Sequence, residues 1–315
     1  PKGAGLSCSL NIMKTLFLSD IHVDFHWKYA VGPKRLYVDD PDELVTPETM
    51  DYIWDYYQIP FVDRLVLAGD YSNDFLTFSR MIPWLAKKYK EVYLVLGNHD
   101  LTVRGGTPSK SNLPFVSSEK KIDEMKAICK MFDNIFLLDG EVINGIGGCM
   151  GMCDFKCEPP QFGLDPFTNW KRHWYDGKFW RYMNQEPGKI WNHYEQKLND
   201  IVKQKPKIVV THFVPYELGI PFEYRNNTWN YVFYFNGEKF FEELDNDTYW
   251  VCGHVHGKRM AEYVNSKGNH IHIMCNPIGY PQEGNTNYCD ILDYTGSKIE
   301  RSSKVVDMND YIIDV

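Results

Sequence analysis

The sequence has no apolar run of about 18 residues, which is the length that a membrane-spanning helix needs, so no such helix is expected. The apolar stretch Leu16–Leu18 is too short for the core of a secretion signal, and no small-residue cleavage site follows it. We therefore expect a cytoplasmic protein. Residues 1–12 are interpreted as a loose leader, either a cloning remnant or an upstream extension.

A basic excess is also missing. The chain has 34 Lys and Arg residues against 42 Asp and Glu residues, which gives a net charge of -8. Proteins that bind nucleic acid backbones usually present a basic face, so long nucleic acid is an unfavoured partner, although the composition does not exclude it. A small phosphorylated substrate remains compatible, because metal ions can supply positive charge locally.

Eight cysteines in 315 residues do not form a disulfide-dense pattern. Cys149, Cys153 and Cys157 recur every four residues, which raises the alternative of a third metal site. Structural zinc sites use short CxxC pairs instead. Buried free thiols are therefore the favoured interpretation.

Short apolar runs alternate with helix-like segments along the first half of the chain. The predicted strands cover residues 14–19, 64–68, 92–96 and 135–138, and the predicted helices cover 46–58, 74–89 and 118–132. This alternation predicts an α/β fold with substantial parallel pairing. The second half predicts strands at 141–152, 208–211 and 249–252, a helix at 190–203, and an antiparallel finish over 260–264, 270–275 and 287–293. No linker interrupts residues 13–315, so we expect one domain.

Polar clusters follow the predicted strands. In chain order they are Asp20-Ile-His22, Gly69-Asp70-Tyr-Ser-Asn73, Gly97-Asn98-His99-Asp100, Thr211-His212 and Gly253-His254-Val-His256. Each cluster alone is unremarkable, since a lone histidine is more often a hydrogen-bonded core residue than a ligand. Together they predict one site, because sites in open α/β sheets form at the carboxyl ends of strands.

Residue spacing and ligand type point to metal chemistry. Asp20 and His22 differ by two positions, so we expect both side chains to face the same side, and likewise His254 and His256 if that segment is extended. Imidazole, carboxylate and amide oxygen suit Mn, Fe or Zn. Two such ions form a clamp for in-line displacement at phosphorus.

This ordered set of clusters resembles the calcineurin-like metallophosphoesterase superfamily, whose pattern is Asp-x-His, Gly-Asp-x-x-Asp, Gly-Asn-His-(Asp/Glu), a lone His, and Gly-His-x-His. The resemblance covers residues 14–280. It implies a four-layer α/β/β/α sandwich and two divalent metal ions. It assigns Asp20, His22 and His256 to one metal, and Asn98, His212 and His254 to the second, with Asp70 bridging both.

The same resemblance implies hydrolysis of a phosphate monoester or diester, with a nucleotide as one substrate option. A metal-bridging hydroxide would attack phosphorus while His99 protonates the leaving group, and Asn73 and Asp100 would support the site from behind. The alternatives are a non-catalytic scaffold on the same fold, a nuclease, and a hydrolase of non-phosphate substrates. Scaffold relatives usually lose ligands, whereas all of them are present here.

Two features depart from the family pattern. Asn73 stands where the family has its second Asp, which in other members orients the catalytic histidine. The arginines that grip phosphate in the protein phosphatase branch are missing from these motifs, which disfavours a protein phosphatase. Arg104 is a candidate replacement, and a surface arginine is the alternative. The run Cys275–Pro281 resembles a late Asn-Pro-x-Gly-Tyr block of bacterial and phage members, and an ordinary turn is the alternative.

Aromatic residues concentrate in two segments, 155–205 and 213–247, which we interpret as cap insertions over the site. Their rings could stack on a planar substrate group, with Tyr216 and Trp229 as the first candidates for substrate contact. The favoured interpretation is that most of these aromatic residues build a local core.

Asn73 generates a testable prediction. An amide can accept a hydrogen bond from the imidazole but brings no charge to stabilise imidazolium, so the pKa of His99 should lie below that of Asp-containing relatives. Asn73→Asp should raise this pKa, and the basic limb of the pH–rate profile should then move to higher pH. An unchanged profile would contradict the hypothesis.

Overall fold

Of the 315 residues, the computed structural model describes 13–30, 46–103, 115, 117–156, 164–181, 189–220, 227, 229–283, 290–292, 298–301 and 311–314. The predicted leader, Cys157 and Arg104 lie outside these ranges. Within them, no helix combines the length and apolar character that a membrane span requires.

The first sheet contains the early parallel strands that the sequence predicts. Its strands are β1 (Lys14–Leu18), β2 (Arg64–Ala68), β3 (Glu91–Val95), β4 (Ile135–Leu137) and β13 (Ile312–Asp314). The order is β13-β1-β2-β3-β4, with β13 antiparallel to β1 and the other pairs parallel. Every residue of β2 is buried, as expected for a strand covered on both faces.

The second sheet has the order β12-β11-β9-β10-β8-β7-β6-β5. Its strands are β5 (Val142–Ile143), β6 (Ile146–Gly148), β7 (Ile208–Val210), β8 (Thr248–Cys252), β9 (Arg259–Val264), β10 (His270–Cys275), β11 (Asp290–Leu292) and β12 (Lys298–Arg301). The predicted antiparallel finish is only partly correct. β9 pairs antiparallel with β10, but β10 lies directly beside β8 and parallel to it. This parallel pairing brings the loops after β8 and β10 to the same edge of the sheet.

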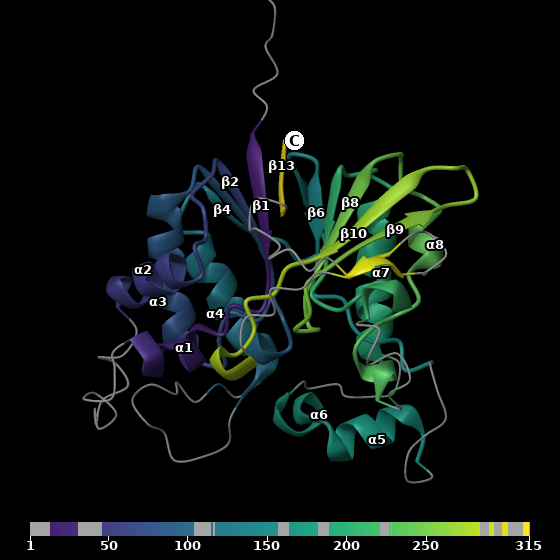
Figure 1. Cartoon of the computed structure of the whole chain (residues 1–315). Helices are drawn as coiled ribbons and strands as arrows, with labels where there is room; N and C mark the ends of the chain where they lie inside the picture. Colours follow the sequence, from purple (N-terminus) through teal and green to yellow (C-terminus); the bar gives the residue numbers. More distant parts are fainter. Residues whose placement is uncertain are drawn as a thin grey trace, which may run out of the picture.

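Helices cover the outer faces of the two sheets, which gives the expected four layers (Figure 1). The helices beside the first sheet are α1 (Val23–Ala30), α2 (Pro47–Tyr56), α3 (Phe75–Lys88) and α4 (Ser118–Cys129), and those beside the second are α7 (Lys189–Val202) and α8 (Glu238–Phe241). α2 begins after the predicted Thr46 cap, with Pro47 in its first turn. Proline is tolerated there because the backbone N–H that it lacks would have no partner within the helix. Two helices that the sequence did not predict, α5 (Pro166–His173) and α6 (Tyr175–Phe179), lie below the sheets in Figure 1.

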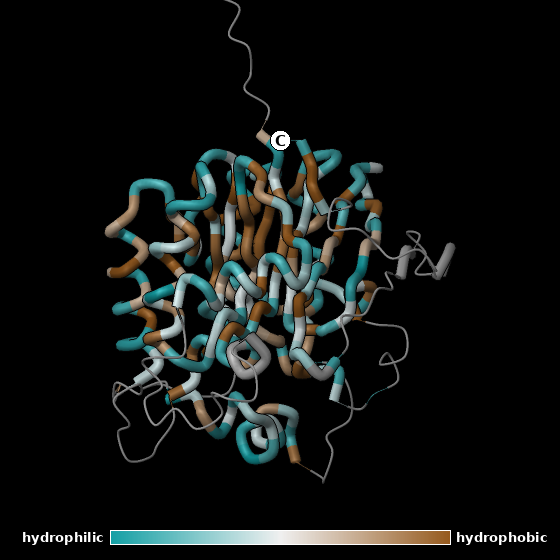
Figure 2. The backbone as a smooth tube through the Cα atoms, turned by 60° about the vertical axis from the view of Figure 1, so that its left-hand side comes forward, coloured by the Kyte–Doolittle hydropathy of each residue, from teal (hydrophilic) through white to brown (hydrophobic). Residues whose placement is uncertain are grey.

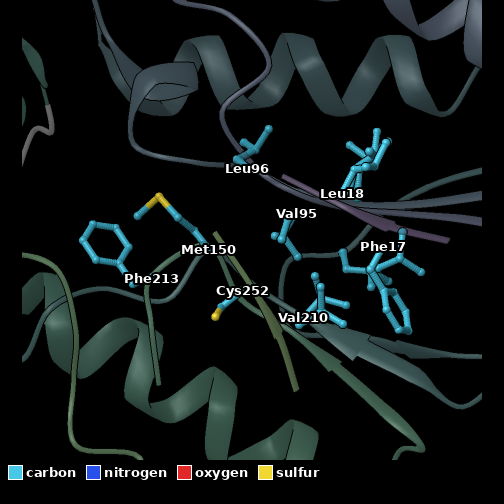
Figure 3. Close-up of a cluster of buried hydrophobic side chains, with 14 of the residues drawn as sticks. Phe17, Leu18, Val95, Leu96, Met150, Val210, Phe213 and Cys252 are labelled. Carbon is cyan, nitrogen blue, oxygen red and sulfur yellow. The ribbon is translucent and has the colours of Figure 1, made fainter. Parts of the chain in front are cut away.

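The core lies between the two sheets. Phe17 and Val95 from the first sheet face Val210 from the second, and all three are fully buried (Figure 3). The most hydrophobic segments in Figure 2 are these central strands. Close approach of the sheets depends on Gly148, because a β-carbon there would lie 2.8 Å from Val95 Cγ1. Cys149 and Cys153 are buried free thiols.

Trp250 on β8 provides a test of the packing between the second sheet and α8. Its ring is fully buried and packs edge-on against Phe241 at 5.1 Å, and its Nε1 donates to Thr211 Oγ1 at 2.9 Å. Trp250→Ala should lower the free energy of unfolding by about 3–5 kcal/mol, because it leaves a large cavity. Met131→Ala, at an exposed position, should change it by less than about 0.5 kcal/mol. Equal urea midpoints for the two variants would contradict this packing.

Candidate active site

The predicted site residues converge at the carboxyl edge of the two sheets. Asp20, Asp70 and Asn98 follow β1, β2 and β3, while His212 and His254 follow β7 and β8. Each lies within three residues of the end of its strand. Parallel strands in both sheets therefore bring residues from distant parts of the chain to one place.

The backbone around these residues is not extended, which corrects the expected geometry. Asp20, His22, Asp70 and His254 have φ values of 51°, 45°, 57° and 68°, in the left-handed region. Asp20 and His22 still join the same group, but through a turn fastened to the β2 loop by hydrogen bonds to Gly69 O and Asp70 O. Left-handed conformations of non-glycine residues cost free energy and concentrate at functional sites.

Asp20, His22 and His256 form the first group of ligand atoms that could hold a metal ion. His22 Nε2 and His256 Nε2 are 3.2 Å apart, and His256 Nε2 lies 3.5 Å from Asp20 Oδ1. His256 and His254 point into different groups, because the segment is not extended, which was the condition for the two rings to share one side. The turn over residues 254–257, with its left-handed first residue, separates the two rings.

The second group comprises Asp70, His212 and His254, with Asn98 between the two imidazoles. Asn98 Oδ1 lies 2.7 Å from His212 Nε2 and 2.8 Å from His254 Nδ1. Asp70 Oδ2 is 3.3 Å from His212 Nε2 and 3.8 Å from His22 Nε2 of the first group. Asp70 therefore lies between the two groups.

The hydrogen bonds behind the imidazoles leave their inner nitrogens as acceptors. His212 Nδ1 donates to Ala68 O at 2.8 Å, and His254 Nε2 donates to Val232 O at 3.3 Å. In the neutral rings, the inner nitrogens then face Asn98 Oδ1, which also only accepts. Such convergent acceptors repel one another unless a cation lies among them. Ligands about 2.1 Å from one ion lie roughly 3.0–3.4 Å apart, and the separations of 2.7–3.8 Å lie on both sides of that range.

The pKa values of the imidazoles differ from one position to the next. Burial lowers the pKa of His22 and of His254 well below the usual value, which favours neutral, ligand-type imidazoles. Burial opposes ionisation of Asp70, yet His212 and the surrounding histidines hold its pKa well below the usual value. For His212 burial acts downward, but Asp70 raises the pKa to about 9. The ionised carboxylate of Asp70 therefore stabilises positive charge on the groups beside it.

Two glycines allow the loops to approach one another. Gly69 has φ +86°, and a β-carbon there would lie 2.6 Å from His212 Nδ1. A β-carbon on Gly97 would lie 2.2 Å from Asp70 Oδ1. Any side chain at either position would displace a residue of the second group.

Asp100 joins the loops after β2 and β3. Its buried carboxylate accepts hydrogen bonds from the backbone N–H groups of Asp70, Tyr71, Ser72 and Gly97 at 2.8–3.1 Å. Burial raises its pKa to about 7. Asp100 therefore lies behind the two loops and fastens one to the other.

His99 is oriented through a chain of three side chains. Its Nδ1 donates to Asn73 Oδ1 at 2.9 Å, and Asn73 Nδ2 donates to Asp24 Oδ2 at 3.1 Å. Tyr175 stacks on the His99 ring at 5.1 Å and donates to the same Asn73 oxygen. The carboxylate of Asp24 thus lies on the far side of the Asn73 amide from His99. An Asp at position 73 would face Asp24, so the predicted pH shift is best measured with Asp24→Asn also in place.

The segment that contains α6 packs directly on the loop after β3. Asp176 Oδ1 accepts from Asn98 Nδ2 at 2.8 Å, which turns the Asn98 oxygen toward the histidines, and Trp180 Nε1 donates to Asn98 O at 2.8 Å. Asp176 is fully buried, and its Oδ2 has no hydrogen-bond partner among the described residues. Burial raises the pKa of Asp176 to about 7. No sequence signal marked Asp176 or Tyr175 among the many polar and aromatic residues of this segment.

A cavity of about 380 Å³ opens over the ligand groups. Its walls are formed by Asp70, Asn98, His99, Trp174, Tyr175, Asp176, Ile220, Asn227, Asn230, Phe233, His254, Val255, His256, Tyr280 and Glu283. The two predicted substrate contacts in the described ranges lie behind this wall. Trp229 packs against Trp174 at 5.3 Å, and Tyr216 donates to Glu238 at 3.1 Å. Trp174 and Phe233 face the cavity in their place.

Comparisons with known proteins agree with the fold. An uncharacterised protein, L509, of Acanthamoeba polyphaga mimivirus is 23% identical over 289 residues, which cover 85% of this chain and 92% of that protein. The crystal structure of phosphopantetheinyl hydrolase from Mycobacterium tuberculosis superposes with a TM-score of 0.60 at 14% identity, over 86% of this chain and 90% of that one. The sequence profile of the calcineurin-like phosphoesterases matches residues 13–258. This chain belongs to the calcineurin-like phosphoesterase family.

Proposed function

We propose that this protein hydrolyses small phosphate esters with two divalent metal ions, and that His99 donates the proton to the leaving group. The observation that supports this most directly is the convergence of two acceptor groups on either side of Asp70, in the same cavity as His99. Mn, Fe and Zn suit the mixed imidazole, carboxylate and amide donor set.

Asp20, His22 and His256 would hold one ion, Asn98, His212 and His254 the other, and Asp70 both. When bound, the two ions would lower the pKa of water and neutralise phosphate charge. The protein supplies orientation through the hydrogen bonds behind each ligand. Glu283 accepts from His256 Nδ1 at 2.7 Å, just as Ala68 O does from His212. Such outer partners usually tune both affinity and activity.

His99 has the geometry of a proton donor in this reaction. Asn73 fixes the proton on Nδ1, so the second nitrogen, Nε2, is the atom available for exchange with substrate. Tyr175 on one face and the edge contact with His22, at 5.0 Å between ring centres, fix the ring plane. A positioned general acid of this kind contributes about 10²–10⁴-fold in rate.

The cavity is suited to a small molecule. Its volume of about 380 Å³ lies within the range of small-molecule sites, and Trp174 and Phe233 offer an apolar wall to the organic part of the ester. A substrate panel should therefore include aryl and nucleoside monoesters, aryl and cyclic diesters, a phosphopantetheine ester and single-stranded DNA.

The panel tests the proposed function. Apo protein loaded with Mn, Fe or Zn should hydrolyse at least one ester, and His99→Ala should reduce kcat about 10²–10⁴-fold while metal content stays unchanged. Asp70→Asn should lose metal as well as activity, because its carboxylate lies between the two groups. His272→Ala, on β10 outside the cavity, is the matched control. Absence of turnover with every metal and ester would contradict an enzymatic function.

Asp176 allows the ligand assignment to be tested without an activity assay. Asp176→Ala removes the acceptor that orients Asn98, so one of the two metal-binding steps should weaken by about 10- to 100-fold. Titration of apo protein with Zn or Mn in a calorimeter would measure this. Asp123→Ala, an exposed change on α4, should leave both steps unchanged. Equal affinities in Asp176→Ala and wild type would show that Asn98 needs no such orientation.

A further inference from the structure

The loop after β10 is fastened to the strand end that presents Asp20. Pro277 bridges to Ser19, Asn276 Nδ2 donates to Phe17 O at 2.8 Å, and Gly279 N donates to Asp20 O at 2.9 Å. These contacts join residues about 260 positions apart in the chain. The loop is therefore a built part of the site and not a peripheral turn.

Tyr280 extends from this loop over the first ligand group. Its ring stacks on His22, with 4.4 Å between ring centres and 29° between planes, and meets His256 edge-on at 4.8 Å. Its backbone N–H donates to Glu283 Oε2 at 2.7 Å, the same oxygen that accepts from His256 Nδ1. The tyrosine is thus held by the same network that holds His256.

The hydroxyl of Tyr280 lies beside the reactive nitrogen of His99. Oη is 3.3 Å from His99 Nε2, and both residues line the cavity. In neutral His99 the single ring proton is on Nδ1, where it is donated to Asn73 Oδ1. Nε2 is then an acceptor, and it accepts a hydrogen bond from the hydroxyl of Tyr280. Once Nε2 is protonated, two donors stand side by side, at a separation that lets one substrate oxygen contact both.

We propose that Tyr280 is a further catalytic residue, whose hydroxyl donates a hydrogen bond to the oxygen that leaves phosphorus. This inference rests on the proposed function. The bond from phosphorus to that oxygen breaks with its electron pair on the oxygen, which takes the proton of His99 Nε2. Water forms the new bond to phosphorus, and the proton it loses restores His99. Tyr280 keeps its proton and stabilises the negative charge that develops on the oxygen.

A comparison of leaving groups tests this role. Tyr280→Phe keeps the stacked ring and removes only the hydroxyl. It should lower kcat/KM about ten- to hundredfold for a phenyl ester, as expected for loss of a hydrogen bond to a charged oxygen. The loss should be several-fold smaller for the p-nitrophenyl ester of the same class, because nitrophenolate needs less stabilisation. Metal content and thermal midpoint should equal those of wild type.

Two variants separate this role from packing. Tyr93→Phe removes a hydroxyl that accepts from Asn144 at 2.8 Å outside the cavity, and it should act equally on both esters. Tyr280→Ala should lose metal affinity if the stacked ring supports His22. A Tyr280→Phe enzyme with wild-type rates, or with equal losses for both esters, would overturn the catalytic role. Wild-type protein that hydrolyses no ester would overturn the proposed function and this inference with it.

Discussion

Mutual repulsion among buried hydrogen-bond acceptors is the constraint on which the site depends. Asn98 Oδ1 and Asp70 Oδ2 lie 2.7 Å and 3.3 Å from His212 Nε2, so three acceptor atoms converge whenever His212 is neutral. Such an arrangement costs free energy unless positive charge offsets it. The fold maintains this arrangement through hydrogen bonds on the far side of each acceptor. The backbone N–H groups of Asp70 and Gly97 donate to the Asp100 carboxylate, and His212 Nδ1 donates to Ala68 O.

The sequence predicts the strands and the order of the site clusters because both depend on local pattern. An apolar run followed by a polar residue is visible in a short window, and parallel strands then bring such residues to one edge. The backbone of the loops is not visible in the same way. Asp20 and His254 adopt left-handed conformations because hydrogen bonds to other loops impose them, and the extended geometry assumed from spacing was therefore wrong.

The residues that hydrogen-bond to the site residues from outside could not be predicted from the sequence. Asp24 lies behind Asn73, 49 positions along the chain, and Asp176 contacts Asn98 across 78 positions. Neither belongs to a motif, and each is one of 42 acidic residues. Only the packing of α1 and α6 against the strand-end loops distinguishes them. The sequence also does not distinguish aromatic residues that build the core from those that line the cavity. Trp170 is buried in local packing, whereas Trp174 faces the cavity.

The packing of α6 on the Asn98 loop has a consequence for how this protein can diverge. One short segment contributes both a wall of the cavity, through Tyr175, and the carboxylate that turns Asn98. Substitutions there that adapt the cavity to a new ligand would at the same time disturb the orientation of Asn98. Changes in selectivity through this segment are therefore tied to changes in the catalytic centre, and evolution is expected to alter Ile220 and Phe233, which line the cavity from another part of the chain, more readily.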